Sequence, residues 1–107
     1  MERKQSAKVK ITVLKTLHHK DLVNDYLITE QHATHSPCDY HYIGQEFIID
    51  NFEKPEGFCS WAWADIHREF ISVMFNADFP NFKDEGTVIA SCTDGLRPVV
   101  FKIERIK

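Results

Sequence analysis

The chain has 107 residues, a length that supports one hydrophobic core and leaves no room for a second. Its formal net charge of −3 argues against a nucleic-acid-binding protein, because the neutralisation of phosphates requires a basic surface. No apolar run approaches the roughly 18 residues that a membrane span needs, and no apolar segment typical of a signal peptide follows the charged N-terminus. We therefore expect a cytoplasmic protein that binds neither nucleic acid nor membranes.

The first predicted strand follows a short polar tail. Residues 1–7 are polar and are expected to be flexible, which leaves residues 8–107 as a single globular domain. Apolar and polar residues alternate over residues 8–13, a period typical of a half-buried strand. The alternation breaks at Leu14, where we expect a bulge or the end of the strand.

A short helix and a long polar connection are predicted next. Residues 21–27 carry apolar side chains at a helical spacing, but so short a helix is weak unless packing holds it. Residues 29–42 are predicted to be irregular, and five of the six histidines lie between His18 and His41. A connection of this length within a compact domain is often functional. A second strand is predicted over residues 46–50.

The longest element should be a helix over residues 60–75, with Ser60 as its N-cap. Its apolar side chains recur every three or four residues and form one stripe, made of Cys59, Trp63, Ile66, Phe70 and Val73. Trp61 and Trp63 point in nearly opposite directions on a helix, so one core cannot take both. With Trp63 in the core, Trp61 should face a loop, a ligand or another subunit, and a subunit there implies a homo-oligomer.

The C-terminal part of the chain predicts a hairpin. Strands are expected over residues 87–92 and 99–104, and Asp94–Gly95 between them is a turn signal. We expect the first and last strands to lie side by side. The predicted fold class is α+β: a small, mainly antiparallel four-stranded sheet, with one long helix, about 60–75, and one short helix packed on it.

Three cysteines, an odd number spread along the chain, do not suggest a disulfide framework. Cys38, Cys59 and Cys92 all lie beside predicted turns, where strand ends and the start of a helix commonly meet. His41 follows Cys38 in a Cys-x-x-His spacing. These four residues are therefore the candidate ligands of a metal ion, with zinc or iron as the candidate metals.

Two other interpretations of the cysteines stay open. A free cysteine is among the most buried residue types, so all three can simply pack in the core. Alternatively, Cys59 is a catalytic thiol, because the start of a helix favours the thiolate. His41 is then the candidate base, and Cys38 and Cys92 are candidate resolving thiols.

Aromatic side chains are dense enough to line a ligand pocket, although in a small domain they first of all form the core. Trp61, Trp63 and Phe79 are the candidate ligand-binding residues among them. Arg97 is a candidate partner for a carboxylate or phosphate on a ligand. It is equally placed to pair with Asp94 on the surface, which is the interpretation that we favour.

Three segments of the chain stand out as motifs. They are Gly57-Phe58-Cys59-x-Trp61-Ala62, Phe79-Pro80, and Cys92-x-Asp94-Gly95-Leu96-Arg97-Pro98-Val99-Val100-Phe101. Together they resemble a family of short, uncharacterised prokaryotic proteins with three single cysteines, and the similarity extends from Lys8 to Lys107. The chain departs from the family at Asp39 and Ser60, where proline is frequent. No activity is established for the family, so the resemblance implies only that the cysteines form a functional site.

The sequence does not specify a reaction. We expect a small cytoplasmic protein whose cysteine-lined site binds a metal ion or reacts with a small molecule. The alternative is a non-catalytic ligand-binding or oligomeric assembly module in which the cysteines are core packing. In that case an aromatic patch around Trp61 and Phe79 meets the partner.

Overall fold

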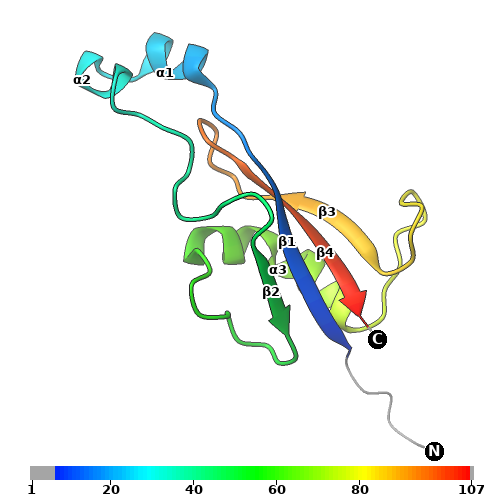
Figure 1. Ribbon diagram of the computed structural model, residues 1–107. Coiled ribbons are helices and arrows are strands. Elements are labelled where there is room, and N and C mark those ends of the chain that lie inside the picture. The colour runs from blue at the N-terminus through cyan, green and yellow to red at the C-terminus, as the bar shows by residue number, and fades with distance from the viewer. Residues whose placement is uncertain (1–6, 107) are drawn as a thin grey trace, which may run out of the picture.

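The computed structural model describes residues 7–106, which form a four-stranded antiparallel sheet and three helices. The elements in chain order are β1 (Lys8–Thr16), α1 (Lys20–Tyr26), α2 (Thr29–His32), β2 (Glu46–Ile49), α3 (Ser60–Met74), β3 (Thr87–Ser91) and β4 (Val99–Ile106). The strand order is β2-β1-β4-β3, so the first and last strands lie side by side at the centre of the sheet (Figure 1). This arrangement confirms the predicted α+β fold.

The N-terminal tail that was predicted to be flexible, residues 1–7, lies outside the described residues except for Ala7. The backbone N–H of Ala7 donates to the carbonyl of Met74 at 2.9 Å, which joins the start of the sheet to the end of α3.

The central pairing of β1 with β4 contains the irregularity that the sequence predicts. Val13 lies opposite Phe101, and the register then shifts between Val13 and Lys15. Beyond this bulge β1 continues further than predicted, because β4 still offers a partner there: Thr16 lies opposite Val99.

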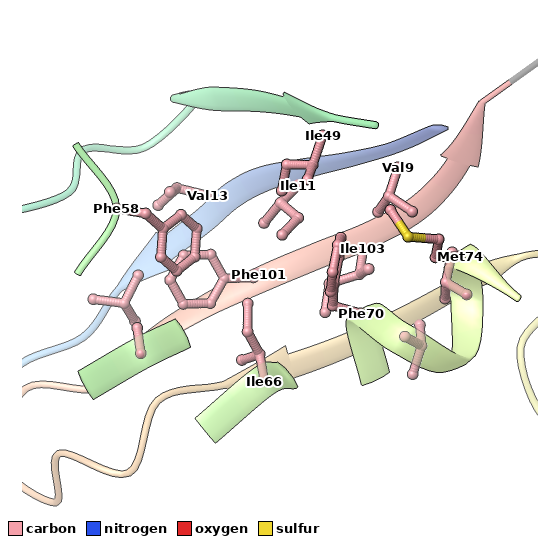
Figure 2. Close-up of a cluster of buried hydrophobic side chains, with 14 residues drawn as sticks. Val9, Ile11, Val13, Ile49, Phe58, Ile66, Phe70, Met74, Phe101 and Ile103 are labelled. Carbon is pink, nitrogen blue, oxygen red and sulfur yellow. The ribbon is translucent and has the colours of Figure 1, made fainter. Parts of the chain in front are cut away.

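The hydrophobic core lies between α3 and one face of the sheet (Figure 2). Val9, Ile11 and Val13 of β1 are buried in one cluster with Ile66 and Phe70 of α3. Burial of each large apolar side chain contributes roughly 1.5–3 kcal/mol. This packing, more than intrinsic helix propensity, holds α3 in place.

The ends of α3 are close to the predicted range. The N-cap residue is Cys59 and not Ser60, because Ser60 already belongs to the helix, and within residues 7–106 no side chain caps this end. The hydroxyl of Ser60 accepts a hydrogen bond from Lys54 Nζ at 2.6 Å. After the helix, Asn76 adopts a φ of 70°, a left-handed conformation that commonly ends helices.

Residues 17–43, here called the arm, connect β1 to β2 and carry α1 and α2 away from the sheet (Figure 1). The sequence did not predict α2, a single turn within a region that was expected to be irregular. Val23 of α1 is fully buried, whereas Tyr26 is 80% exposed although the helical spacing places both on one side. The arm therefore has very little core of its own.

Two contacts fix the base of the arm. The N–H of His19 donates to the carbonyl of Leu96 at 2.8 Å, which continues the pairing between the two central strands beyond their ends. The rings of His18 and His35 stack with centroids 5.0 Å apart, and Nε2 of His18 lies 2.8 Å from Nδ1 of His35. The start of the arm is thereby held to the segment that follows α2.

Candidate functional site

Three segments that are distant in the sequence meet at one cavity, here called the thiol pocket. Its walls include Cys38 from the arm, Cys59 and Trp61 from the start of α3, and Cys92 and Arg97 from the loop between β3 and β4. The volume of the cavity is about 220 Å³. Pockets for drug-sized ligands hold roughly 300–1,000 Å³, so this one suits a small molecule.

The cysteines are free thiols, and each is partly buried against the edge of the core. Cys59 lies at the positive end of the dipole of the 15-residue helix α3. The Sγ atom of Cys92 accepts a hydrogen bond from the backbone N–H of Val99 at 3.3 Å. None of the three residues is fully buried, and all three line the thiol pocket.

The candidate metal ligands do not form a metal site as they stand. Within residues 7–106, no group of three or more histidine, cysteine, aspartate or glutamate side chains is arranged to hold a metal ion. Cys38, Cys59 and Cys92 therefore share a pocket without closing on a common point. A metal ion would require the thiols to draw closer together.

His41 joins the arm to the start of α3. Its ring is only 3% exposed and lies against the rings of three phenylalanines. The Nε2 atom accepts a hydrogen bond from the backbone N–H of Cys59 at 3.3 Å, and Nδ1 lies 2.8 Å from Oε1 of Gln45. Both ring nitrogens are thus engaged by the protein.

These partners define the tautomer of His41. The amide oxygen of Gln45 can only accept, so Nδ1 carries the proton and Nε2 offers its lone pair to the N–H of Cys59. A metal ion or a thiol would have to displace this N–H to reach Nε2. The roles of His41 as metal ligand or base stay predictions, whereas its hydrogen bonds favour a positioning role.

Trp61 forms a fixed and exposed wall of the thiol pocket. Its side chain is 63% exposed, and its indole N–H donates to Thr93 Oγ1 at 2.9 Å. Thr93 is itself held by Asp65, whose Oδ2 accepts from the hydroxyl at 2.9 Å and from the backbone N–H at 2.7 Å. Trp61 therefore faces a loop, one of the three alternatives left by the sequence, and presents a ring face to solvent.

The ion pair that the sequence favoured for Arg97 is present. Nε of Arg97 donates to Oδ2 of Asp94 at 3.3 Å, and Oδ1 accepts from the backbone N–H groups of Leu96 and Arg97. Partial burial acts to raise the pKa of Asp94, but these hydrogen bonds and the guanidinium charge outweigh it and lower the pKa below its usual value. Both residues line the thiol pocket.

Two of the predicted ligand-binding residues lie elsewhere. Trp63 packs against the core, with its ring 4.8 Å from that of Phe70. Phe79 also packs against the core, next to Phe82. Of the three aromatic candidates, only Trp61 is among the described residues that line the thiol pocket.

Several residues that shape the site were not singled out from the sequence. Gln45, Asp65 and Thr93 orient pocket residues through hydrogen bonds to partners up to 32 positions away. No local pattern marks them, because each acts through a contact that only the folded chain creates.

Comparison of the chain with protein-family models, with curated proteins and with solved structures gives no match in any of the three. The resemblance to short prokaryotic proteins with three cysteines therefore stays a prediction. No helix in the described part of the chain is long and apolar enough to cross a bilayer.

Proposed function

We propose that this protein binds a small, thiol-reactive molecule in the thiol pocket and that Cys59 is the residue that reacts with it. The observation that carries the proposal is the meeting of Cys38, Cys59 and Cys92 in one small cavity. Because the three cysteines come from three separate segments, a shared function explains their meeting better than chance does. Core packing alone would favour complete burial of the sulfur atoms.

Cys59 is the best candidate nucleophile among the three. It is the N-cap residue of α3, next to the backbone N–H groups of the first helical turn, which have no partner within the helix. Its backbone is held by His41, so its position relative to the pocket is fixed before a ligand arrives. Cys38 and Cys92 then serve as neighbouring thiols that contact the ligand.

Alkylation with iodoacetamide tests this proposal. The thiolate of Cys59 attacks the reagent's methylene carbon, a C–S bond forms, and iodide leaves with the electron pair of the C–I bond. Reaction rates at each cysteine are measured by peptide mass mapping in the native and the urea-unfolded protein. We expect Cys59 to react faster in the native protein than in the unfolded chain. A native rate at Cys59 that is below its rate in the unfolded chain would contradict the proposal.

A measurement of the metal content of anaerobically purified protein distinguishes metal binding from the proposed reaction with a small molecule. About one metal ion per chain in the wild type, absent from Cys59→Ala, would favour the metal site over the small-molecule pocket. Free thiols at all three positions fit a reducing compartment, and on that basis we propose that the protein is cytoplasmic.

A second candidate function is assembly through the mouth of the pocket. Trp61 and Tyr40 both line the pocket, and they are 63% and 55% exposed. Large exposed aromatic side chains are typical of surfaces that meet another protein. Light scattering of wild type and Trp61→Ala tests this candidate: an oligomer that the substitution dissociates supports it, and an unchanged oligomeric state contradicts it.

A further inference from the structure

We infer that the ligand of the thiol pocket carries a carboxylate, which the guanidinium of Arg97 binds while the reactive part of the ligand faces the thiols. This inference rests on the proposed function and adds the chemical class of the ligand. Arg97 lies at the pocket wall and is paired there with Asp94.

The ion pair with Asp94 occupies only one edge of the Arg97 guanidinium. Nε donates to Asp94, whereas neither Nη atom is hydrogen-bonded to any group between residues 7 and 106. Asp94 is itself fixed by two backbone N–H groups of its own loop. The pair therefore holds the guanidinium in place and leaves its two Nη atoms available, which is the fork that matches the two oxygens of a carboxylate.

The surroundings of Arg97 are basic on the side of the arm. Partial burial lowers the pKa of His18, and the positive charge of nearby groups lowers it further. These groups, from the largest effect to the smallest, are His35, Lys20, Arg97 and His19. Arg97 and Lys20 both act on His18, so the positive charge of Arg97 is not isolated on this side of the arm, which favours the approach of an anion.

Two carboxylates at the pocket act against this attraction and limit the ligand to a small charge. The charge of Asp94 is offset by Arg97 and by two N–H donors. Asp39 is exposed at the wall, where water screens its charge. A ligand with one carboxylate meets the free edge of Arg97 without the repulsion that a second or third negative charge would add.

The size of the pocket and the fixed ring of Trp61 complete the description of the ligand. A volume of about 220 Å³ matches a short organic acid better than a larger ligand such as a nucleotide. The indole of Trp61, locked by Thr93, offers an apolar surface to the carbon atoms of such an acid.

Iodoacetate and iodoacetamide form a matched pair of probes for this inference. They have the same reactive carbon and leaving group, but only iodoacetate carries a carboxylate. With a free thiolate, iodoacetate is the slower reagent because the two negative charges repel each other. We expect the ratio of the iodoacetate rate to the iodoacetamide rate at Cys59 to be about fivefold higher in the native protein than in the urea-unfolded chain.

The outcomes of this experiment are separable. An unchanged ratio, with iodoacetamide still reacting faster at native Cys59 than at unfolded Cys59, overturns the carboxylate inference and leaves the proposed function intact. Slow reaction of native Cys59 with both reagents overturns the proposed function itself.

Substitutions of Arg97 test whether this residue causes the higher ratio of the iodoacetate rate to the iodoacetamide rate. We expect Arg97→Gln to return the ratio to that of the unfolded chain, and Arg97→Lys to keep part of the increase because it retains a charge without the fork. Arg68→Gln is the matched control, since Arg68 is an exposed arginine of α3 paired with Glu69. A raised ratio that persists in folded Arg97→Gln overturns the role of Arg97. If this variant does not fold, the ratio in the wild-type protein still tests whether the pocket prefers a carboxylate.

Discussion

The imidazole of His41 accepts a hydrogen bond from the backbone N–H of Cys59 and thereby ties the arm to the N-cap residue of α3. The other ring nitrogen of His41 bonds to Gln45, which precedes β2. One buried side chain thus connects three segments of the chain. The position of the thiol of Cys59, and with it one wall of the thiol pocket, depends on this connection.

Replacement of His41 by phenylalanine should weaken the fold. The variant His41→Phe keeps a ring in the core but leaves the partly buried N–H of Cys59 without its partner, at a cost of about 1–3 kcal/mol. The amide oxygen of Gln45 still accepts from the N–H of Tyr42. We expect a lower urea midpoint with little change in the slope. His67→Phe, on the partly buried flank of α3, is the control and should change the midpoint much less. Equal midpoints for His41→Phe and wild type would show that the connection contributes no stability.

The pair of His18 and His35 predicts that the arm loosens in acid. The hydrogen bond between the rings needs one unprotonated nitrogen, so it is lost when both rings are protonated. The pKa of His18 is lower in the folded chain than its usual value, because of partial burial first and nearby positive charge second. The folded state therefore binds fewer protons than the unfolded chain. The contribution of the pair to the free energy of unfolding is complete above about pH 6.5, and it is lost as the pH falls through the folded pKa of His18.

Amide hydrogen exchange checks this dependence on pH. Protection of residues 33–43, expressed relative to the unfolded rate, should be lower in the wild type at a pH below the folded pKa of His18 than at a pH above about 6.5. The variant His35→Phe keeps an aromatic ring but cannot be protonated, so its protection should not change with pH. His19→Gln removes a neighbouring histidine outside the pair and should behave like the wild type. The same protection at both pH values in the wild type would contradict the role of the pair.

The network of Trp61, Thr93 and Asp65 predicts a fixed indole. Thr93→Val keeps the shape of the side chain but removes the hydroxyl that accepts from Trp61 and donates to Asp65. We expect the indole N–H of Trp61 to exchange with solvent several-fold faster in this variant, as measured by NMR. Because the network is exposed, the loss of stability should stay near 0.5–1.5 kcal/mol. Thr87→Val, at a threonine of β3 outside the network, is the control, and equal exchange in wild type and Thr93→Val would refute the network.

The addition of a single methyl group at Gly86 should destabilise the fold. It adopts a φ of +68°, and a Cβ atom there would lie 2.8 Å from the guanidinium carbon of Arg105. That guanidinium is held by the carbonyls of Val73 and Ala77, so it cannot yield without losing hydrogen bonds. We expect Gly86→Ala to lose about 1–3 kcal/mol in urea unfolding. Gly95→Ala, where a Cβ meets nothing within 4 Å, should cost far less, and equal losses in the two variants would contradict the strain at Gly86.

The sequence predicted those parts of the fold that depend on local periodicity. The alternation of Val9, Ile11 and Val13 identified the buried face of β1, and the stripe that includes Ile66 and Phe70 identified the buried face of α3. These patterns succeed because burial on one side of a strand or helix is imposed on neighbouring residues in the chain.

The candidate site was less accessible to prediction because its geometry depends on contacts between distant segments. The opposite directions of Trp61 and Trp63 followed from helix geometry, but nothing in the sequence indicated that Thr93 would bind the indole of Trp61. The use of both nitrogens of His41 was equally hidden, since its partner on Cys59 is a backbone N–H, which every residue except proline possesses.

The proposed function requires that three distant cysteines line one pocket that a ligand can enter. The most direct measurement uses a protein whose Cys59 carries an N-ethylmaleimide adduct, a group large enough to occupy much of the cavity of about 220 Å³. Rates of iodoacetamide reaction at Cys38 and Cys92 are compared with those in Cys59→Ala, natively and in urea. We expect iodoacetamide to react several-fold more slowly at both cysteines in the native adduct than in native Cys59→Ala, and at equal rates in urea. Equal native rates in the adduct and in Cys59→Ala would contradict a shared pocket.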